Sequence, residues 1–160
     1  MAKITLKDLS HSYLTKQNND ADWALRGVNI DWKDGGAYAL LGPSGCGKTT
    51  LLNIISGLLK PTKGEILFDD KDVTSLNPVE RDIAQIFQFP VIYDTMTVYD
   101  KLAFTLKNRG LSETEIDSKV KEIAEMLELT STLKNKAAGL TADGKQKISL
   151  GRGLVRSDVN

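Results

Sequence analysis

Residues 42–49 read Gly42-Pro43-Ser44-Gly45-Cys46-Gly47-Lys48-Thr49 and match the pattern G-x-x-x-x-G-K-[ST] at every fixed position. This pattern is typical of a phosphate-binding loop, because its glycines let successive backbone N–H groups surround phosphate oxygens. In such a loop Lys48 contacts the β- and γ-phosphates, and the Thr49 hydroxyl ligates Mg²⁺. Cys46 is expected to contribute only its backbone N–H, since no histidine or second cysteine lies nearby in the sequence to activate its thiol.

The surroundings of the loop fit this interpretation. The apolar run Ala37–Leu41 precedes it and predicts a strand buried on both faces. The apolar residues of 49–59 follow it and predict a largely buried helix, whose N-terminus adds a partial positive charge at the loop. Alternating apolar residues predict earlier strands at 4–6 and 28–32. Two more strands are expected at 65–69 and 82–88, joined by a connector over 74–81.

The second half of the sequence has a helical period from about Thr97. Ser112-Glu113-Thr114-Glu115 predicts a capping box at the start of a helix. The apolar face of this helix comprises Ile116, Val120, Ile123, Ala124 and Leu127. A further helix is expected from about Thr141 to Val155.

Composition limits the classes of protein that remain. The 160 residues carry 21 basic and 21 acidic side chains, so overall charge provides no attraction to nucleic acid. One cysteine and one histidine exclude an intramolecular disulfide and a structural zinc cluster. Because the sequence starts without an apolar signal region and has no long apolar stretch, we expect a soluble cytoplasmic chain.

Residues around the loop resemble the ATP-binding subunits of ATP-binding-cassette (ABC) transporters. Tyr13 follows the first strand, and Gln88 lies forty residues beyond Lys48 at the end of an expected strand. The segments 42–59, 81–88 and 97–104 look like the carbohydrate-importer branch, which includes importers of polyols and glycerol phosphates. Without the family, Tyr13 would be an ordinary core or surface tyrosine, and Gln88 would be a strand-terminal residue that bonds to the backbone.

The resemblance implies an α/β fold, with a P-loop NTPase core of the ABC ATPase type and an antiparallel β subdomain. Residues 1–160 would form an incomplete nucleotide-binding domain. Residues 1–88 would be part of the ATP-binding core, and residues 89–156 the start of a helical subdomain with a degenerate signature helix. The C-terminal strands of the core sheet would be missing.

The resemblance also implies a site for ATP and Mg²⁺. Tyr13 would stack on adenine, residues 42–50 (to Thr50) would bind the phosphates, and Gln88 would reach Mg²⁺ and the attacking water. His11 is expected to be a surface residue rather than a ligand, and it is not given the role of the family's catalytic histidine, which belongs much later in the chain. The expected partners are a second ATPase subunit, arranged head to tail in a homo- or heterodimer, and permease subunits that contact residues 89–99. The subunit would sit at the cytoplasmic face of the membrane, without nucleic acid.

The sequence departs from the family in two places. Leu140-Thr141-Ala142-Asp143-Gly144 stands where the family has Leu-Ser-Gly-Gly-Gln. Thr141 and Gly144 would still reach the partner's phosphate, but Asp143 brings a like charge to it unless a cation such as Lys145 compensates. The strand that carries the family's magnesium-side aspartate and general base, and the later histidine, are expected beyond Arg156. We therefore expect the 160 residues alone to lack hydrolysis.

Three other functions are alternatives to an importer ATPase. A degenerate ATP-binding partner without turnover is suggested by Asp143 and by the missing elements. A DNA-repair or translation ATPase is disfavoured because the sequence has no basic cluster. A phosphate-loop kinase or GTPase is disfavoured because no Asn-Lys-x-Asp element is present.

Overall fold

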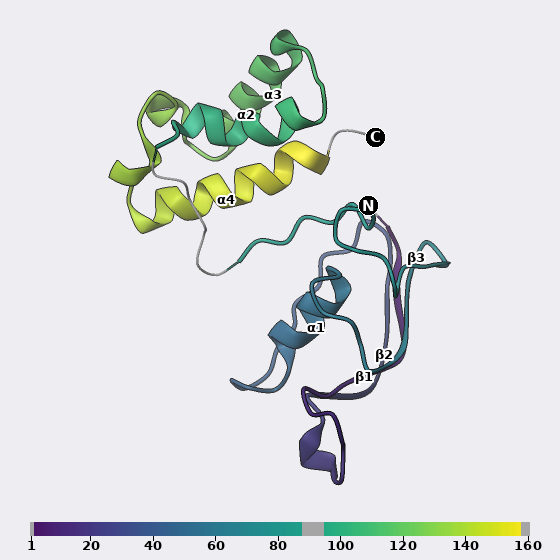
Figure 1. Cartoon of the computed structure of the whole chain (residues 1–160). Coiled ribbons are helices and arrows are strands. Elements are labelled where there is room, and N and C mark those ends of the chain that lie inside the picture. Colours follow the sequence, from purple (N-terminus) through teal and green to yellow (C-terminus); the bar gives the residue numbers. More distant parts are fainter. Residues whose placement is uncertain (1, 88–94, 158–160) are drawn as a thin grey trace. The chain divides into compact units, whose positions relative to one another are not determined.

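The computed structural model describes residues 2–87 and 95–157, which form two compact units, Met1–Ile83 and Ala84–Asn160 (Figure 1). The elements of the first unit are β1 (Ile4–His11), η1 (Asp20–Asp22), β2 (Leu25–Trp32), α1 (Lys48–Ile55), β3 (Lys63–Phe68) and β4 (Lys71–Asp72). The elements of the second unit are α2 (Val98–Asn108), α3 (Glu113–Met126), η2 (Thr130–Thr132), η3 (Ala137–Gly139) and α4 (Ala142–Ser157).

The first unit contains an antiparallel sheet in the order β2-β1-β3-β4. Leu6 of β1 pairs with Ile30 on one side and with Ile66 on the other, so apolar side chains share one face of the sheet. Helix α1 packs its apolar side chains, including Leu51 and Ile54, into the same core. The predicted strands near 4–6, 28–32 and 65–69 are therefore confirmed as parts of β1, β2 and β3.

Strand β1 is irregular at Asp8, which has a φ of 46° and lies where both pairing registers shift. Gly64 of β3 lies opposite this irregularity with a φ of 90°. A Cβ at Gly64 would lie 2.5 Å from the carbonyl oxygen of Lys7 and 2.6 Å from that of Asp8. Only glycine fits at this position, because both the backbone conformation and the close approach exclude a side chain.

Two predicted strands are wrong in the part of the chain that the structure describes. Neither residues 37–41 nor residues 83–87 belong to a ladder of backbone hydrogen bonds. Tyr38 instead turns back across the Asp34–Gly35 turn. Its ring stacks on that of Trp32 with the ring centroids 5.6 Å apart, and its hydroxyl accepts a hydrogen bond from the backbone N–H of Lys33. Leu41 is 90% exposed. An apolar run does not by itself supply the neighbouring strand that a buried strand requires.

The helix after the loop is shorter than its apolar pattern predicts. It ends at Ile55 rather than Leu59, because Gly57 has a left-handed φ of 82°. Arg81 donates hydrogen bonds to the carbonyl oxygens of Ile54 and Ile55, and these bonds satisfy the helix end. Leu58, beyond this end, is 54% exposed.

The second unit is a helical cluster around an apolar core shared by α2, α3 and α4. Its α3 begins with the predicted capping box between Ser112 and Glu115, and four of the five predicted apolar residues are buried. The predicted last helix is confirmed as α4. Gly151 allows α4 to approach α2, since a Cβ there would lie 2.6 Å from Cδ2 of Leu102. Among the described residues, no helix is both long and apolar enough to cross a membrane.

Candidate functional site

The phosphate loop begins at Gly42 and ends at the N-terminus of α1, as the motif predicts. Gly45 and Gly47 have φ values of 83° and 90°, in the region that favours glycine. A Cβ at Gly47 would lie 2.6 Å from the carbonyl oxygen of Ala24, so the loop lies against the backbone just before β2. A Cβ at Gly45 would meet no atom within 4 Å. The backbone at Gly45 is therefore open to a ligand that approaches closely.

The Lys48 ammonium lies over the loop. Its Nζ donates hydrogen bonds to the carbonyl oxygens of Gly42 at 2.8 Å and Pro43 at 2.7 Å. Cys46 Sγ is a third contact at 3.4 Å, so the cation two residues further along the loop lies beside this thiol. Thr49 is exposed in the first turn of α1. The loop thus contains an ammonium and a hydroxyl, which are the groups that a triphosphate and its Mg²⁺ require.

Tyr13 lies beside this loop although 35 residues separate it from Lys48. Its hydroxyl is 3.1 Å from Oγ1 of Thr50, in the first turn of α1, and its side chain is 66% exposed. The structure therefore places an accessible aromatic ring next to the phosphate loop. A purine base has an aromatic face that can stack on such a ring.

His11 is buried, and the expectation of a surface residue was wrong. The side chain is 6% exposed, and its ring meets the Tyr13 ring edge to face with the centroids 4.7 Å apart. His11 ends β1 and Tyr13 lies two residues beyond it, outside the strand, so the alternation of side chains along a strand did not predict this contact.

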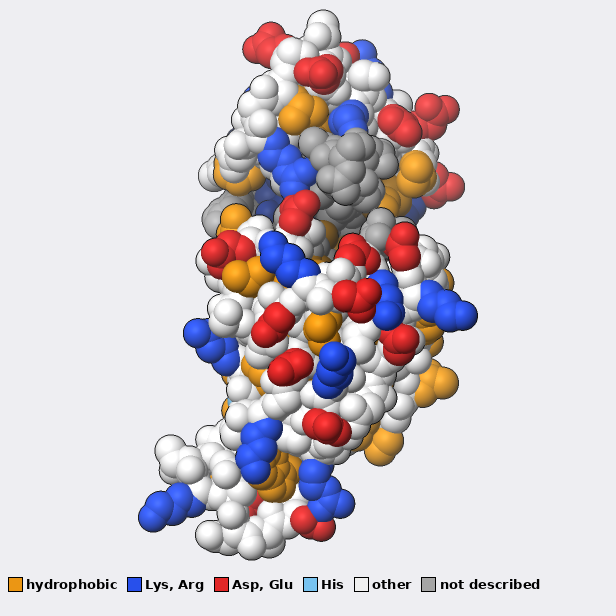
Figure 2. Space-filling view, turned by 90° about the vertical axis from the view of Figure 1, so that its right-hand side faces the viewer, with side chains coloured by type: hydrophobic (Ala, Val, Ile, Leu, Met, Phe, Trp, Pro, Cys, Tyr) orange, Lys and Arg blue, Asp and Glu red, His pale blue; other side chains and the backbone are white. Residues whose placement is uncertain are grey.

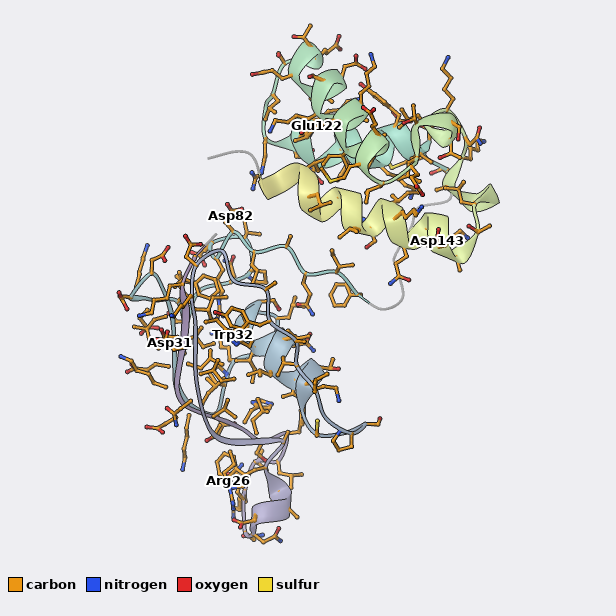
Figure 3. The ribbon with its side chains drawn as sticks, turned by 180° about the vertical axis from the view of Figure 1, so that it is seen from behind. Arg26, Asp31, Trp32, Asp82, Glu122 and Asp143 are labelled. Carbon is orange, nitrogen blue, oxygen red and sulfur yellow. The ribbon has the colours of Figure 1, made fainter. Side chains whose placement is uncertain are left out.

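The two predicted signature residues lie at the start of α4. Thr141 Oγ1 accepts a hydrogen bond from the backbone N–H of Gly144, which makes Thr141 a cap of the helix. Asp143 follows in the first turn, where Figure 3 labels it. Its nearest cation is Lys147, at 3.7 Å, and not Lys145. Asp143 and Lys147 are one helical turn apart, so their side chains are neighbours on the same face of α4, which explains the ion pair.

Lys147 also contacts Glu128 at 3.0 Å. This hydrogen bond lowers the pKa of Glu128 and raises the pKa of Lys147. The charge of Asp143 is thus opposed by a cation shared with a second carboxylate. Gln88, the remaining predicted site residue, lies outside the described residues, as do residues 89–94 of the predicted permease contact.

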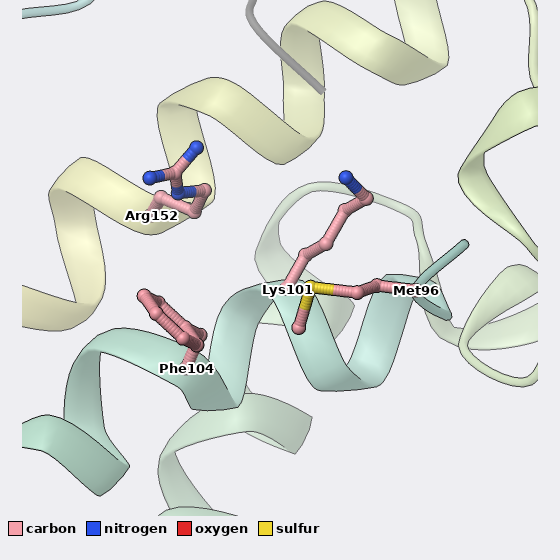
Figure 4. Close-up of a pocket in the computed structure, with 4 residues that line it drawn as sticks. All are labelled: Met96, Lys101, Phe104 and Arg152. Carbon is pink, nitrogen blue, oxygen red and sulfur yellow. The ribbon is translucent and has the colours of Figure 1, made fainter. Parts of the chain in front are cut away.

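A separate pocket lies in the helical unit. Met96, Lys101, Phe104 and Arg152 line it, from α2, the residues before it and α4 (Figure 4).

On the face shown in Figure 2, basic and acidic side chains are interspersed. Charge alone therefore marks no binding surface on that face.

Comparison with known proteins places these features in context. Residues 25–158 match the family described as "ABC transporter". The chain is 40% identical over 156 residues to the sn-glycerol-3-phosphate import ATP-binding protein UgpC of Cupriavidus metallidurans, covering 98% of this chain and 41% of UgpC. It is 45% identical over 139 residues to the trehalose/maltose import ATP-binding protein MalK of Thermococcus litoralis, covering 83% of this chain and 37% of MalK. The chain thus spans about two fifths of the length of these curated relatives.

Solved structures are similar over almost the whole chain. The ATP-binding cassette MJ1267 of an ABC transporter superposes with a TM-score of 0.82 at 30% identity, covering 98% of this chain and 66% of that one. CbiO1 from Clostridium perfringens, part of the ABC transporter complex cbiONQ, superposes with a TM-score of 0.83 at 28% identity, covering 96% of this chain and 61% of that one.

Proposed function

The chain belongs to the ABC transporter family, and from this membership we propose that it is the ATP-binding part of an importer subunit. The subunit would couple ATP binding and hydrolysis to the import of a solute. The observation that carries the proposal is the position of Tyr13 beside the phosphate loop, where its hydroxyl lies 3.1 Å from Oγ1 of Thr50, next to Lys48 and Thr49 in the sequence. The names of the relatives support a sugar, a polyol or a glycerol phosphate as the solute.

Different residues bind different parts of the nucleotide. Tyr13 stacks on adenine, and the amides of residues 42–50 surround the phosphates. Lys48 exchanges its bonds to the carbonyl oxygens of Gly42 and Pro43 for bonds to the β- and γ-phosphates. The exchange replaces two neutral acceptors by charged ones, and therefore favours a bound triphosphate.

Two further groups act on the γ-phosphate side. The Thr49 hydroxyl would hold Mg²⁺, which would neutralise phosphate charge when bound. Gln88 is proposed to reach Mg²⁺ and the attacking water. Catalysis of phosphoryl transfer consists mostly of positioning and charge stabilisation. Thr49 and Gln88 would therefore act by positioning Mg²⁺ and the attacking water.

The remaining assignments concern assembly. We assign residues 1–88 to the ATP-binding core and residues 89–156 to a helical subdomain. A second ATPase subunit packs head to tail, so that Thr141 and Gly144 approach the phosphate held by the partner. The position of Thr141 at the N-terminus of α4 supports this role, since helix N-termini favour anions. Permease subunits hold the assembly at the cytoplasmic face of the membrane.

Lys48→Ala tests the proposed nucleotide site. A hydrogen bond to a charged group contributes about 1.5–3 kcal/mol, so the affinity for ATP should fall about 10- to 150-fold. The measurement is a titration with a fluorescent ATP analogue. Lys60→Ala, which removes an exposed lysine after α1, is the matched control and should bind like the parent chain. Equal affinities for the parent and Lys48→Ala would exclude Lys48 from the site.

A further inference from the structure

The single histidine of the chain has an unusual environment. His11 is the last residue of β1 and is buried. Its Nδ1 lies 3.4 Å from Oγ1 of Thr62, whereas its Nε2 is buried without a hydrogen-bond partner among the described residues. A buried polar atom left without a partner costs free energy.

The buried ring of His11 contacts the ring of Tyr13. The His11 and Tyr13 rings meet at an interplanar angle of 87°, the edge-to-face arrangement that places a positive ring edge against a negative ring face. At its other end, the Tyr13 hydroxyl is bonded to Thr50 in the first turn of α1. An exposed tyrosine would ordinarily sample several rotamers, but this one is held at both its ring and its hydroxyl.

The support behind His11 is itself anchored to the sheet. Thr62 Oγ1 accepts a hydrogen bond from the backbone N–H of Ser12 at 3.0 Å, and the backbone N–H of Thr62 donates to the carbonyl oxygen of Ser10 at 2.9 Å. These bonds tie the end of β1 to the segment that enters β3. His11 therefore stands on rigid backbone, and the Tyr13 ring that leans on it is exposed.

We propose that His11 is a positioning residue for nucleotide binding, which holds the Tyr13 ring in the orientation that stacks on adenine. This inference rests on the proposed function, because it takes Tyr13 as the adenine-stacking residue. Ordering a free aromatic side chain during binding reduces affinity. The contact with His11 orders the ring beforehand, so part of that reduction is avoided.

The test compares ATP with inorganic triphosphate, which has no base. His11→Ala should weaken ATP binding about two- to twelvefold, the range expected for loss of one edge-to-face pair, and should leave triphosphate binding unchanged. His11→Phe restores an aromatic ring without nitrogen and should recover most of the ATP affinity. In a Tyr13→Ala background, His11→Ala should have no further effect on ATP affinity, because the two residues act as a unit.

The outcomes separate the two proposals. If His11→Ala weakens ATP and triphosphate equally, or weakens ATP as much in the Tyr13→Ala background, His11 is only structural and the inference is overturned. If Tyr13→Ala weakens the binding of ATP and of triphosphate equally, the assignment of Tyr13 to the adenine site is wrong. If neither ligand binds the parent chain, the proposed nucleotide site fails before His11 is considered.

Proton NMR of the parent chain gives a readout that does not depend on a His11 variant folding. The two carbon-bound ring protons of His11 are the only histidine ring signals, and the Tyr13 ring current should displace them. Tyr13→Leu should remove this displacement, and ATP but not triphosphate should shift the signals further. Signals that are unchanged by both Tyr13→Leu and ATP would refute the positioning role.

Discussion

Replacement of Arg81 by methionine should strongly destabilise the first unit. Arg81 is 5% exposed and donates four hydrogen bonds, all to main-chain carbonyl oxygens. Two of them, to Ile54 and Ile55 at 2.8 Å, are buried and hold the end of α1. The other two go to Leu76 at 3.0 Å and Thr74 at 3.0 Å, where water can replace the guanidinium.

The magnitude follows from the two buried bonds. Each bond to a charged group contributes about 1.5–3 kcal/mol, which together is about 3–6 kcal/mol. Burial lowers the pKa of Arg81, with the charge of Asp72 opposing this shift, so the cation is partly desolvated. Methionine avoids that cost, and the expected loss therefore lies in the lower half of the range.

Urea unfolding followed by tryptophan fluorescence measures this loss selectively. Both tryptophans, Trp23 and Trp32, lie in the unit that contains Arg81, and Figure 3 labels Trp32. Arg26→Met is the matched control, because Arg26 is an exposed arginine of the same unit and forms an ion pair with Asp20 at the surface. The control should keep the urea midpoint of the parent chain. An unchanged midpoint for Arg81→Met would refute the argument that these bonds hold α1.

Two further predictions follow from the loop and from α3. Gly47→Ala should abolish binding of the fluorescent ATP analogue, because its Cβ would enter the backbone at Ala24, whereas Gly139→Ala, at an open position, should bind normally. Hydrogen bonds from Ser112 lower the pKa of Glu115 below its ordinary 4.5, so the carboxylate stabilises α3 above that pH and loses this effect as the pH falls through the lowered pKa. The midpoint of thermal unfolding of Glu115→Gln should therefore lie below that of the parent at pH 7 and approach it in acid. A difference between the midpoints that is independent of pH would contradict the stabilising role of the Glu115 carboxylate.

Much of the local structure could be predicted from the sequence. The solved structures confirm the predicted α/β fold with a P-loop core of the ABC ATPase type. The capping box at Ser112 and the apolar face of α3 are as the spacing predicted, because both depend on residues three or four apart. The strands expected at 37–41 and 82–88 are absent from the described residues 37–41 and 82–87, since a strand depends on a partner that its own residues do not specify.

The sequence by itself determined the phosphate loop. Its glycines allow the backbone conformations that the loop requires, and Lys48 supplies its positive charge. Tertiary structure decided which groups surround that loop. It buried His11 and placed the Tyr13 hydroxyl beside Thr50, 37 residues away in the sequence. Contacts between residues far apart in the chain depend on how strands and helices pack, and packing is a property of the whole fold.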